Sequence, residues 1–453
     1  MRKLITVFAI ALLGISAAFA QKATKYNQYG VAVESDVLDV EAQDGILVLE
    51  SPTSGYKLWF DSRVQADGAV YFGAPDYADA IGAGTSIRRA RFAVKAQVNK
   101  DWYGEFDMDL ANGLVELKDA IVRYTGIPNL DLQVGNFKEN FSIQRNTTSR
   151  YLQFIERPMV CSALAPSRHL GFNAKYANGP IWASAGVFAQ KVAGVEEWDL
   201  TADNNKDFGR NAGYSATAKV VYRPLYKMDN ASLHLGAAIS YRTPKVTDDS
   251  YGAYRASARN STNINRKKYL DTDNMPGFHH NLLYTLELAG HWDALRYEAA
   301  YMATDVYFNA EAADNVTKHF GGWYAQAGYL LFGGKQRYDS KGGKYTKVER
   351  GRDWGDVELC ARYEYCNLNS GTIFGGSGEA YTLGINYYVN DNVKMQLNYQ
   401  FNNNDRYANG KGKLFVGKDA AGNPTKDYSQ VVDLAGKAGV DYHMLAIRFE
   451  IDF

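Results

Sequence analysis

The sequence predicts an all-β fold, a transmembrane antiparallel β-barrel of about sixteen strands. Three observations predict it: an export signal at the N-terminus, a strictly alternating C-terminal segment that ends in an aromatic residue, and connections that alternate between short and long. Any one of them also occurs in other proteins, but bacterial outer-membrane barrels combine all three. We therefore expect strands with lipid on one side and water on the other.

The N-terminus has the organisation of a secretory signal peptide. Residues 1–3 give a positively charged start, residues 4–19 form an apolar run, and Ala-Phe-Ala at 18–20 fits a small-x-small cleavage site. The run is too short and wrongly flanked for a membrane-spanning helix. We expect Sec-type export and cleavage after Ala20.

The C-terminal segment, residues 442–453, alternates strictly. One side is apolar and the other mostly polar, as on a strand whose side chains alternate between faces. The apolar side holds Leu445, Ile447, Phe449, Ile451 and Phe453. The terminal Phe453 resembles the signal that bacterial outer-membrane barrels present to their assembly machinery.

Similar alternating segments occur along the whole mature chain. We expect residues 21–55 to form an N-terminal periplasmic segment and residues 56–453 to form the barrel. The predicted strands are 56–66, 86–98, 102–110, 116–125, 130–137, 168–177, 181–190, 211–223, 231–243, 281–292, 294–308, 319–332, 353–366, 378–389, 391–402 and 442–453. Their number is even and their lengths suit a tilted strand that crosses a bilayer.

The connections support the same architecture. Tight turns at 99–101, 126–129, 178–180, 293 and 390 are interleaved with long connections at 67–85, 138–167, 191–210, 244–280 and 403–441. Short periplasmic turns and long outer loops give this pattern. Gly333–Arg352 is long where a short turn is expected, and we interpret it as an extended periplasmic turn.

Composition limits the possible functions. The 50 basic and 50 acidic residues balance, so no overall charge favours nucleic acid as a partner. Three cysteines do not form a disulfide framework, and the histidines lack metal-ligand spacing. We expect no catalytic constellation, no metal and no cofactor.

The alternation also assigns faces to the first two strands. Arg or Lys facing lipid at mid-bilayer costs about 2–4 kcal/mol, so the charged side should face the lumen. This places Arg63, Arg89, Arg91 and Lys95 inside the barrel, on neighbouring strands.

Several short stretches, in order, resemble the phosphate-selective porins O and P. They are Ile-Arg-Arg-Ala-Arg-Phe-Ala-Val from Ile87, Lys-Asp-Trp from Lys100, Leu-Lys-Asp-Ala from Leu117, Val-Gly-Asn-Phe-Lys from Val134, Phe-Ile-Glu-Arg-Pro from Phe154, and Tyr-Thr-Leu-Gly-Ile-Asn-Tyr-Tyr from Tyr381. The resemblance runs from about Gly45 to Phe453. It implies a trimeric barrel of sixteen strands whose third loop, here Lys138–Ser167, folds inward and narrows the pore.

The resemblance also implies a central anion site. Matching the family's motifs position by position gives Arg63 on the first strand, the pair Arg88 and Arg89 on the second, Asp119 on the fourth, and Arg145, Ser149 and Arg150 in the inward loop. Arginine offers a rigid fork of donors to phosphate oxygens, and a carboxylate accepts a hydrogen bond from a protonated one.

Three positions depart from a simple reading. Strict alternation gives Arg88 the lipid-facing parity, so we expect it near the strand mouth or on a bulge. Arg145 stands where the family has a lysine, and Arg91 adds a positive charge where a neutral polar residue is expected.

The sequence therefore predicts an outer-membrane porin, not an enzyme, for passive diffusion of small anions such as phosphate or polyphosphate. Its partners would be those anions, outer-membrane lipid and two further copies in a homotrimer. The alternatives are a general small-solute porin without phosphate selectivity, an adhesin or receptor barrel with a plugged lumen, and a barrel enzyme.

Overall fold

The computed structural model describes residues 25–33, 36–43, 45–74, 80–189, 191–192, 213–244, 246–247, 250–406, 417–425, 430, 432 and 439–453. The predicted signal peptide at 1–20 lies outside the described residues, as do Gln190 and residues 211–212 at the ends of two predicted strands. Within the described part of the chain, no helix is long and apolar enough to cross a membrane.

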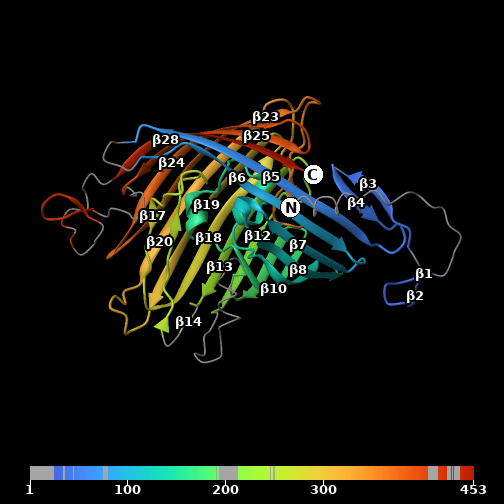
Figure 1. Ribbon diagram of the computed structural model, residues 1–453, viewed down its shortest axis with the longest axis horizontal. Helices are drawn as coiled ribbons and strands as arrows, with labels where there is room; N and C mark the ends of the chain where they lie inside the picture. The colour runs from blue at the N-terminus through green and yellow to red at the C-terminus, as the bar shows by residue number, and fades with distance from the viewer. Residues whose placement is uncertain are drawn as a thin grey trace.

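Sixteen antiparallel strands close into a barrel (Figure 1). They are β5 (Lys57–Phe72), β6 (Gly84–Gln97), β7 (Trp102–Asp109), β8 (Glu116–Ile127), β9 (Leu130–Lys138), β10 (Arg168–Asn178), β11 (Ile181–Phe188), β12 (Ser215–Tyr222), β13 (Ala231–Arg242), β18 (Phe278–Trp292), β19 (Leu295–Phe308), β20 (Lys318–Leu330), β23 (Asp356–Ser370), β24 (Ile373–Tyr388), β25 (Val393–Asn404) and β28 (Val440–Asp452). The barrel closes where β28 pairs with β5, from His443 opposite Phe72 to Asp452 opposite Arg63.

The predicted all-β barrel is confirmed, and each predicted strand corresponds to one strand of the barrel. The largest differences are at the ends. β5 continues to Phe72 rather than stopping at Ala66, because the residues after Ala66 keep pairing with both β6 and β28. β24 likewise begins at Ile373, five positions before the predicted Gly378.

The faces follow the predicted alternation. On β5, Val70 and Phe72 are 48% and 51% exposed on the outer wall, whereas Arg63 and Gln65 are 4% and 0% exposed. The charged side of the strand is therefore inside, where it is covered by other polar groups rather than by lipid.

Shorter elements occupy the connections and the N-terminal part. The hairpin of β3 (Asp39–Gln43) and β4 (Ile46–Glu50) pairs with the start of β5. It uses the same edge of β5 that pairs with β28 further along the strand. The remaining elements are β1 (Lys25–Tyr26), β2 (Ala32–Val33), η1 (Ala111–Gly113), α2 (Ile143–Asn146), η2 (Ser149–Tyr151), α3 (Met159–Ala163), β14 (Val246–Thr247), β15 (Ser250–Tyr251), β16 (Ser257–Ala258), β17 (Leu270–Asp271), β21 (Tyr338–Asp339), β22 (Lys344–Tyr345), β26 (Gly417–Lys418) and β27 (Pro424–Thr425).

The connection between β9 and β10, residues 139–167, contacts strands far from both. Its backbone N–H groups donate to wall side chains: Ile143 to Glu287 of β18 at 2.7 Å, and Ile155 to Asn398 of β25 at 2.9 Å. Met159 donates to Glu364 of β23 at 2.5 Å. Residues 139–167, which we call the inward segment, are therefore bonded to lumen-facing side chains of strands that are distant from β9 and β10.

Wall side chains also donate to carbonyls of this segment. Arg296 bonds Tyr151 O at 2.9 Å, Arg362 bonds Glu156 O at 2.9 Å, and Arg448 bonds Ile155 O at 2.6 Å. The segment thus exchanges hydrogen bonds with an arc of wall from β18 to β28, which we call the anchoring wall. Buried backbone groups need such partners, and here the wall provides them.

Gly333–Arg352 is an extended connection, as predicted, and contributes no strand to the barrel. It contains the hairpin of β21 and β22, which is bonded to lumen-facing groups: Tyr338 Oη lies 2.7 Å from His234 Nδ1, and Tyr345 Oη donates to Tyr297 O at 2.6 Å. The guanidinium of Arg296 lies 3.6 Å from the centre of the Tyr345 ring.

The face assignment predicts that Val94→Arg prevents stable insertion. Val94 lies on the outer side of β6, and an arginine there costs about 2–4 kcal/mol near the middle of the bilayer. Heat-modifiable gel migration after refolding into lipid should show a much smaller folded fraction. Gln97→Arg, at the end of the same strand on the other side, is the control and should fold normally.

The anchoring wall predicts that Asn398→Leu loosens the segment 139–167. The change leaves Ile155 N–H buried without an acceptor, at a cost of about 1–3 kcal/mol, and adds no charge. Single-channel recordings should show a larger or noisier conductance. Asn281→Leu is the control, because Asn281 is an equally buried lumen residue that bonds Thr304 of the wall instead. Identical conductance in both variants would show that the bond does not hold the segment.

Candidate functional site

Two β-bulges place charged side chains in the lumen. On β6, Arg89 pairs with Gln65 and Ile87 pairs with Ala66, so Arg88 is the extra residue. Ile87 is 45% exposed on the outer wall, and the bulge turns both arginines away from it. The expectation that Arg88 sits on a bulge is confirmed.

The second bulge is on β8. Phe106 pairs with Ala120 and Met108 with Leu117, so Lys118 and Asp119 together oppose Asp107. In each bulge two consecutive charged residues stand between two apolar ones that face outward. A charged pair that strict alternation would divide between lipid and lumen is thereby kept on one side.

Arg63 and the inward segment meet directly. Its Nη1 donates to Thr148 Oγ1 at 3.1 Å and to Ser149 Oγ at 3.0 Å. Arg63 is also the cross-strand partner of Arg91, so two guanidinium groups share this part of the wall. Arg150 of the same segment is held by ion pairs with Asp61 and, at 3.7 Å, with Asp452.

A cavity of about 360 Å³ lies between the inward segment and the wall formed by β5–β10. Nine basic and five acidic side chains line it. The basic ones are Arg63, Arg91, Lys95, Arg123, Lys138, Arg150, Arg168, Lys175 and Lys344, and the acidic ones are Asp61, Glu105, Asp107, Asp119 and Asp131. We call this the wall cavity.

A second cavity, of about 260 Å³, lies between the inward segment and the connection that follows β13. Its charged lining is Arg88, Arg157, Arg259, Lys268 and Glu156, and hydroxyl groups of four Ser and Thr residues complete it. We call this the loop cavity. Like the wall cavity, it carries an excess of positive charge.

Among the described residues, Glu156 is the one carboxylate that lines the loop cavity. It forms a two-pronged ion pair with Arg88, with Nη2 3.3 Å from Oε2, and lies 3.5 Å from Arg448 Nη2. Burial opposes its ionisation, but Arg88, Arg89 and Arg448 outweigh burial and lower the pKa of Glu156. It is therefore ionised at neutral pH and offsets part of the arginine charge.

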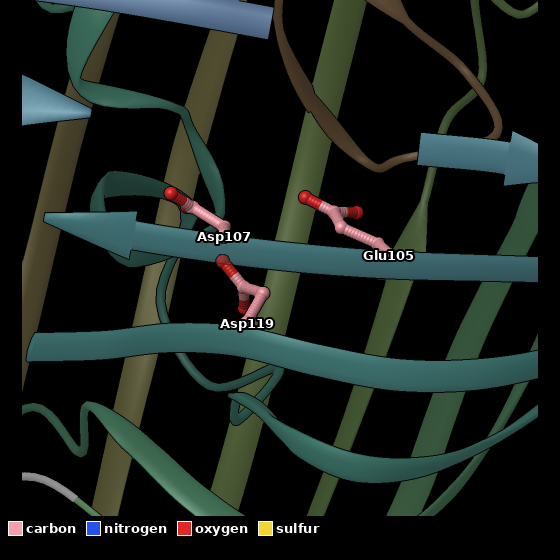
Figure 2. A group of neighbouring side chains, drawn as sticks. All are labelled: Glu105, Asp107 and Asp119. Atoms are coloured by element: carbon pink, nitrogen blue, oxygen red, sulfur yellow. The ribbon is translucent and has the colours of Figure 1, made fainter. Parts of the chain in front are cut away.

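Three carboxylates of the wall cavity form a group (Figure 2). Glu105 and Asp107 of β7 and Asp119 of β8 lie close together, with one oxygen of each within 4.8 Å of the others. Each already has a cationic partner: Lys95 at 3.7 Å, Arg91 at 3.4 Å and Arg168 at 2.5 Å, respectively. Because protein cations balance the group, we assign no metal to it.

The structure brings together only part of the predicted site. Arg63, Asp119 and Arg150 line the wall cavity, and Ser149 bonds Arg63 beside it. Arg88 lines the loop cavity instead.

Arg89 and Arg145 line neither of these two cavities. Arg89 is 4% exposed and bonded to Gln65 at 2.7 Å, and Arg145 donates to Cys161 O at 2.9 Å within its own segment. Both are held by the protein rather than open to water.

Sequence reasoning assigned no role to Glu156 or Arg168, and placed Arg91 without a partner. Glu156 stands in one of the motifs that carry the family resemblance, but its pairing with Arg88 joins residues 68 positions apart. Arg168, as the first residue of β10, has the parity of the outer wall, so alternation alone could not place it beside Asp119.

A closed sixteen-stranded barrel with an apolar outer face and a charged, water-accessible interior defines a porin of the bacterial outer membrane. The chain belongs to the phosphate-selective porin O and P family, whose model matches residues 60–421. The resemblance read from its motifs is thus confirmed.

Two curated relatives are similar over most of this chain. Porin O of Pseudomonas aeruginosa is 24% identical over 432 residues, which are 88% of this chain and 95% of that protein. An uncharacterized protein of Caulobacter vibrioides is 27% identical over 328 residues, 70% of this chain but only 63% of the relative's own length.

Solved structures with a similar chain path include OmpT of Vibrio cholerae, an outer-membrane protein in trimer form. Its TM-score is 0.49, and it is 12% identical over 87% of this chain and 99% of that chain. The anion-selective porin of Comamonas acidovorans has a TM-score of 0.47 and 10% identity over 88% of this chain and 100% of that one.

The Arg88–Glu156 pair predicts that Glu156→Gln makes the pore more selective for anions. The change keeps the shape of the side chain but removes the carboxylate that Glu156 contributes to the lining of the loop cavity. The anion-to-cation permeability ratio, from reversal potentials in a KCl gradient, should rise. Glu311→Gln, in an exposed connection, is the control, and an unchanged ratio in both variants would contradict the prediction.

Proposed function

We propose that this protein is a passive channel of the outer membrane that favours small anions, with phosphate or a short polyphosphate as its solute. One observation carries the proposal: basic side chains outnumber acidic ones in both cavities beside the inward segment. In a narrow space with walls of low dielectric, such an excess attracts anions and repels cations.

Unused donors support binding as well as attraction. Arg63 Nε is buried and has no hydrogen-bond partner within the described residues, and the same holds for both amide atoms of Asn146. Asn146 lines the wall cavity next to Thr148 and Arg150. A tetrahedral oxyanion offers several acceptors to such a set, and a protonated one also offers a donor to the amide oxygen.

The binding should be of moderate strength. Most cationic side chains of the wall cavity already form an ion pair with a carboxylate, as Lys95 does with Asp61 and Arg168 with Asp119. An anion must therefore compete with protein carboxylates for these groups, which limits its affinity and lets it leave. This balance suits a channel better than a high-affinity receptor or a catalytic site.

The rest of the assembly follows the family resemblance. We propose a homotrimer, with the signal peptide removed, residues 21–55 in the periplasm and the long connections outside. Chemical cross-linking of the detergent-extracted protein tests the trimer.

The test of selectivity is the reversal potential of reconstituted protein, followed by phosphate block of the chloride current. The wild type should prefer anions, and phosphate should block at lower concentration than sulfate. Arg63→Gln should weaken both the anion preference and the phosphate block, because Arg63 lines the wall cavity with a positive charge that glutamine lacks. Arg255→Gln is the control, since Arg255 lies in a connection beyond β13 and pairs with Asp271 at 2.5 Å.

Each outcome decides between functions. Anion preference without phosphate block would indicate a general porin for small solutes. Cation preference would contradict the proposal, and the absence of any conductance would favour a plugged barrel.

A further inference from the structure

Asn136 of β9 is a buried polar residue with the outward parity of its strand. Val134, of the same parity, is 52% exposed, whereas Asn136 is 3% exposed. Its Nδ2 donates to Lys118 O of β8 at 2.6 Å. A buried polar group is costly unless it is hydrogen-bonded, so this side chain is explained by the carbonyl that it holds.

What it holds is the β8 bulge. Lys118 is one of the two bulged residues. These residues lie between the regular pairs Phe106–Ala120 and Met108–Leu117, so the Lys118 carbonyl lies outside the regular hydrogen-bond ladder of β7 and β8. Asn136 is the ladder partner of Ala120, the first regular residue beyond the bulge. Its amide therefore supplies the bond that the ladder has lost.

Gly135 allows the two strands to approach. Its φ is +128°, and a Cβ there would lie 2.0 Å from Ala120 O. Any other residue would push β9 away from the bulge, and the amide of Asn136 would then not reach Lys118 O. The Val-Gly-Asn-Phe-Lys and Leu-Lys-Asp-Ala motifs are thus two halves of one structure.

We infer that Asn136 is a positioning residue of the pore: by holding Lys118 O, it fixes the bulge that directs the Asp119 carboxylate into the wall cavity beside Arg168. Asp119 is the next residue after Lys118, and its carboxylate lies 2.5 Å from Arg168 Nη2. The role rests on the proposed function, because the position of Asp119 affects transport only if ions pass through the cavity.

The placement is tested by labelling. Asp119→Cys should react with a water-soluble, negatively charged methanethiosulfonate reagent, whereas the three native cysteines are buried and serve as the blank. Adding Asn136→Leu should slow labelling about tenfold. Loss of one buried hydrogen bond shifts an equilibrium by about this factor, here the equilibrium between strands with residue 119 facing the cavity and strands with it turned away. Asn136→Gln, which keeps the donor, should restore most of the rate. An unchanged rate in Asn136→Leu would overturn the inference.

Selectivity gives a second readout that a purely structural role would not follow. Asp119→Asn removes a carboxylate from the cavity and should raise the anion-to-cation permeability ratio. Asn136→Leu should raise it in the same direction, yet add nothing in the Asp119→Asn background, because both act through one carboxylate. Equal effects of Asn136→Leu in both backgrounds would reject the inference.

The two failures are distinguishable. If the wild type shows no anion preference and Asp119→Asn changes nothing, the proposed function fails, while the labelling rates still decide whether Asn136 places residue 119. Should Asn136→Leu not fold by heat-modifiable migration, Asn136→Ser replaces it, because serine is too short to reach Lys118 O and alters the outer face less.

Discussion

The interior of this barrel depends on how the segment 139–167 is bonded to one arc of its wall. Buried backbone N–H and C=O groups must be satisfied, and the short helices of this segment satisfy only some of them within the segment itself. Here Glu287, Glu364 and Asn398 accept its N–H groups, and arginines of the same arc donate to its carbonyls. These bonds fix on which side of the barrel the segment lies.

The asymmetry of the lumen follows from that placement. On the anchoring wall, charges pair within the wall, as Lys394 does with Glu450 at 3.5 Å and Arg362 with Glu364 at 3.1 Å. The β5–β10 wall also contains ion pairs, such as Lys95 with Asp61 and Arg168 with Asp119, but basic residues are in excess in the cavity beside it. Under the proposed function, an anion meets this excess of positive charge, while the anchoring wall holds the segment 139–167.

The strands could be predicted from the sequence because the physical rule behind them is local. A strand between lipid and water must alternate, so period-two patterns identified all sixteen strands, and the Ile-Arg-Arg-Ala stretch predicted that Arg88 lies near the strand mouth or on a bulge. The same signal occurs at β8, where Leu117 and Ala120 both face outward although they are three positions apart.

The site could be predicted only in part, because its contacts join distant residues. The burial of Arg89 depends on Gln65, which itself bonds Glu450, and no local pattern relates these positions. Likewise, Arg145 turns back to a carbonyl of its own segment, although its charge and its place in the inward loop suggested an ion contact. Residue type and parity identify lumen charges, but only the fold decides which of them remain open to solute.

The central claim is that anions pass between the segment 139–167 and the β5–β10 wall. Crystals soaked in bromide test it most directly, because anomalous scattering locates the anion without any functional assay. The account predicts bromide in the wall cavity near Arg63 and Asn146, with the segment still bonded to the anchoring wall. Bromide found only elsewhere in the lumen, or a segment bonded to the β5–β10 wall instead, would contradict it.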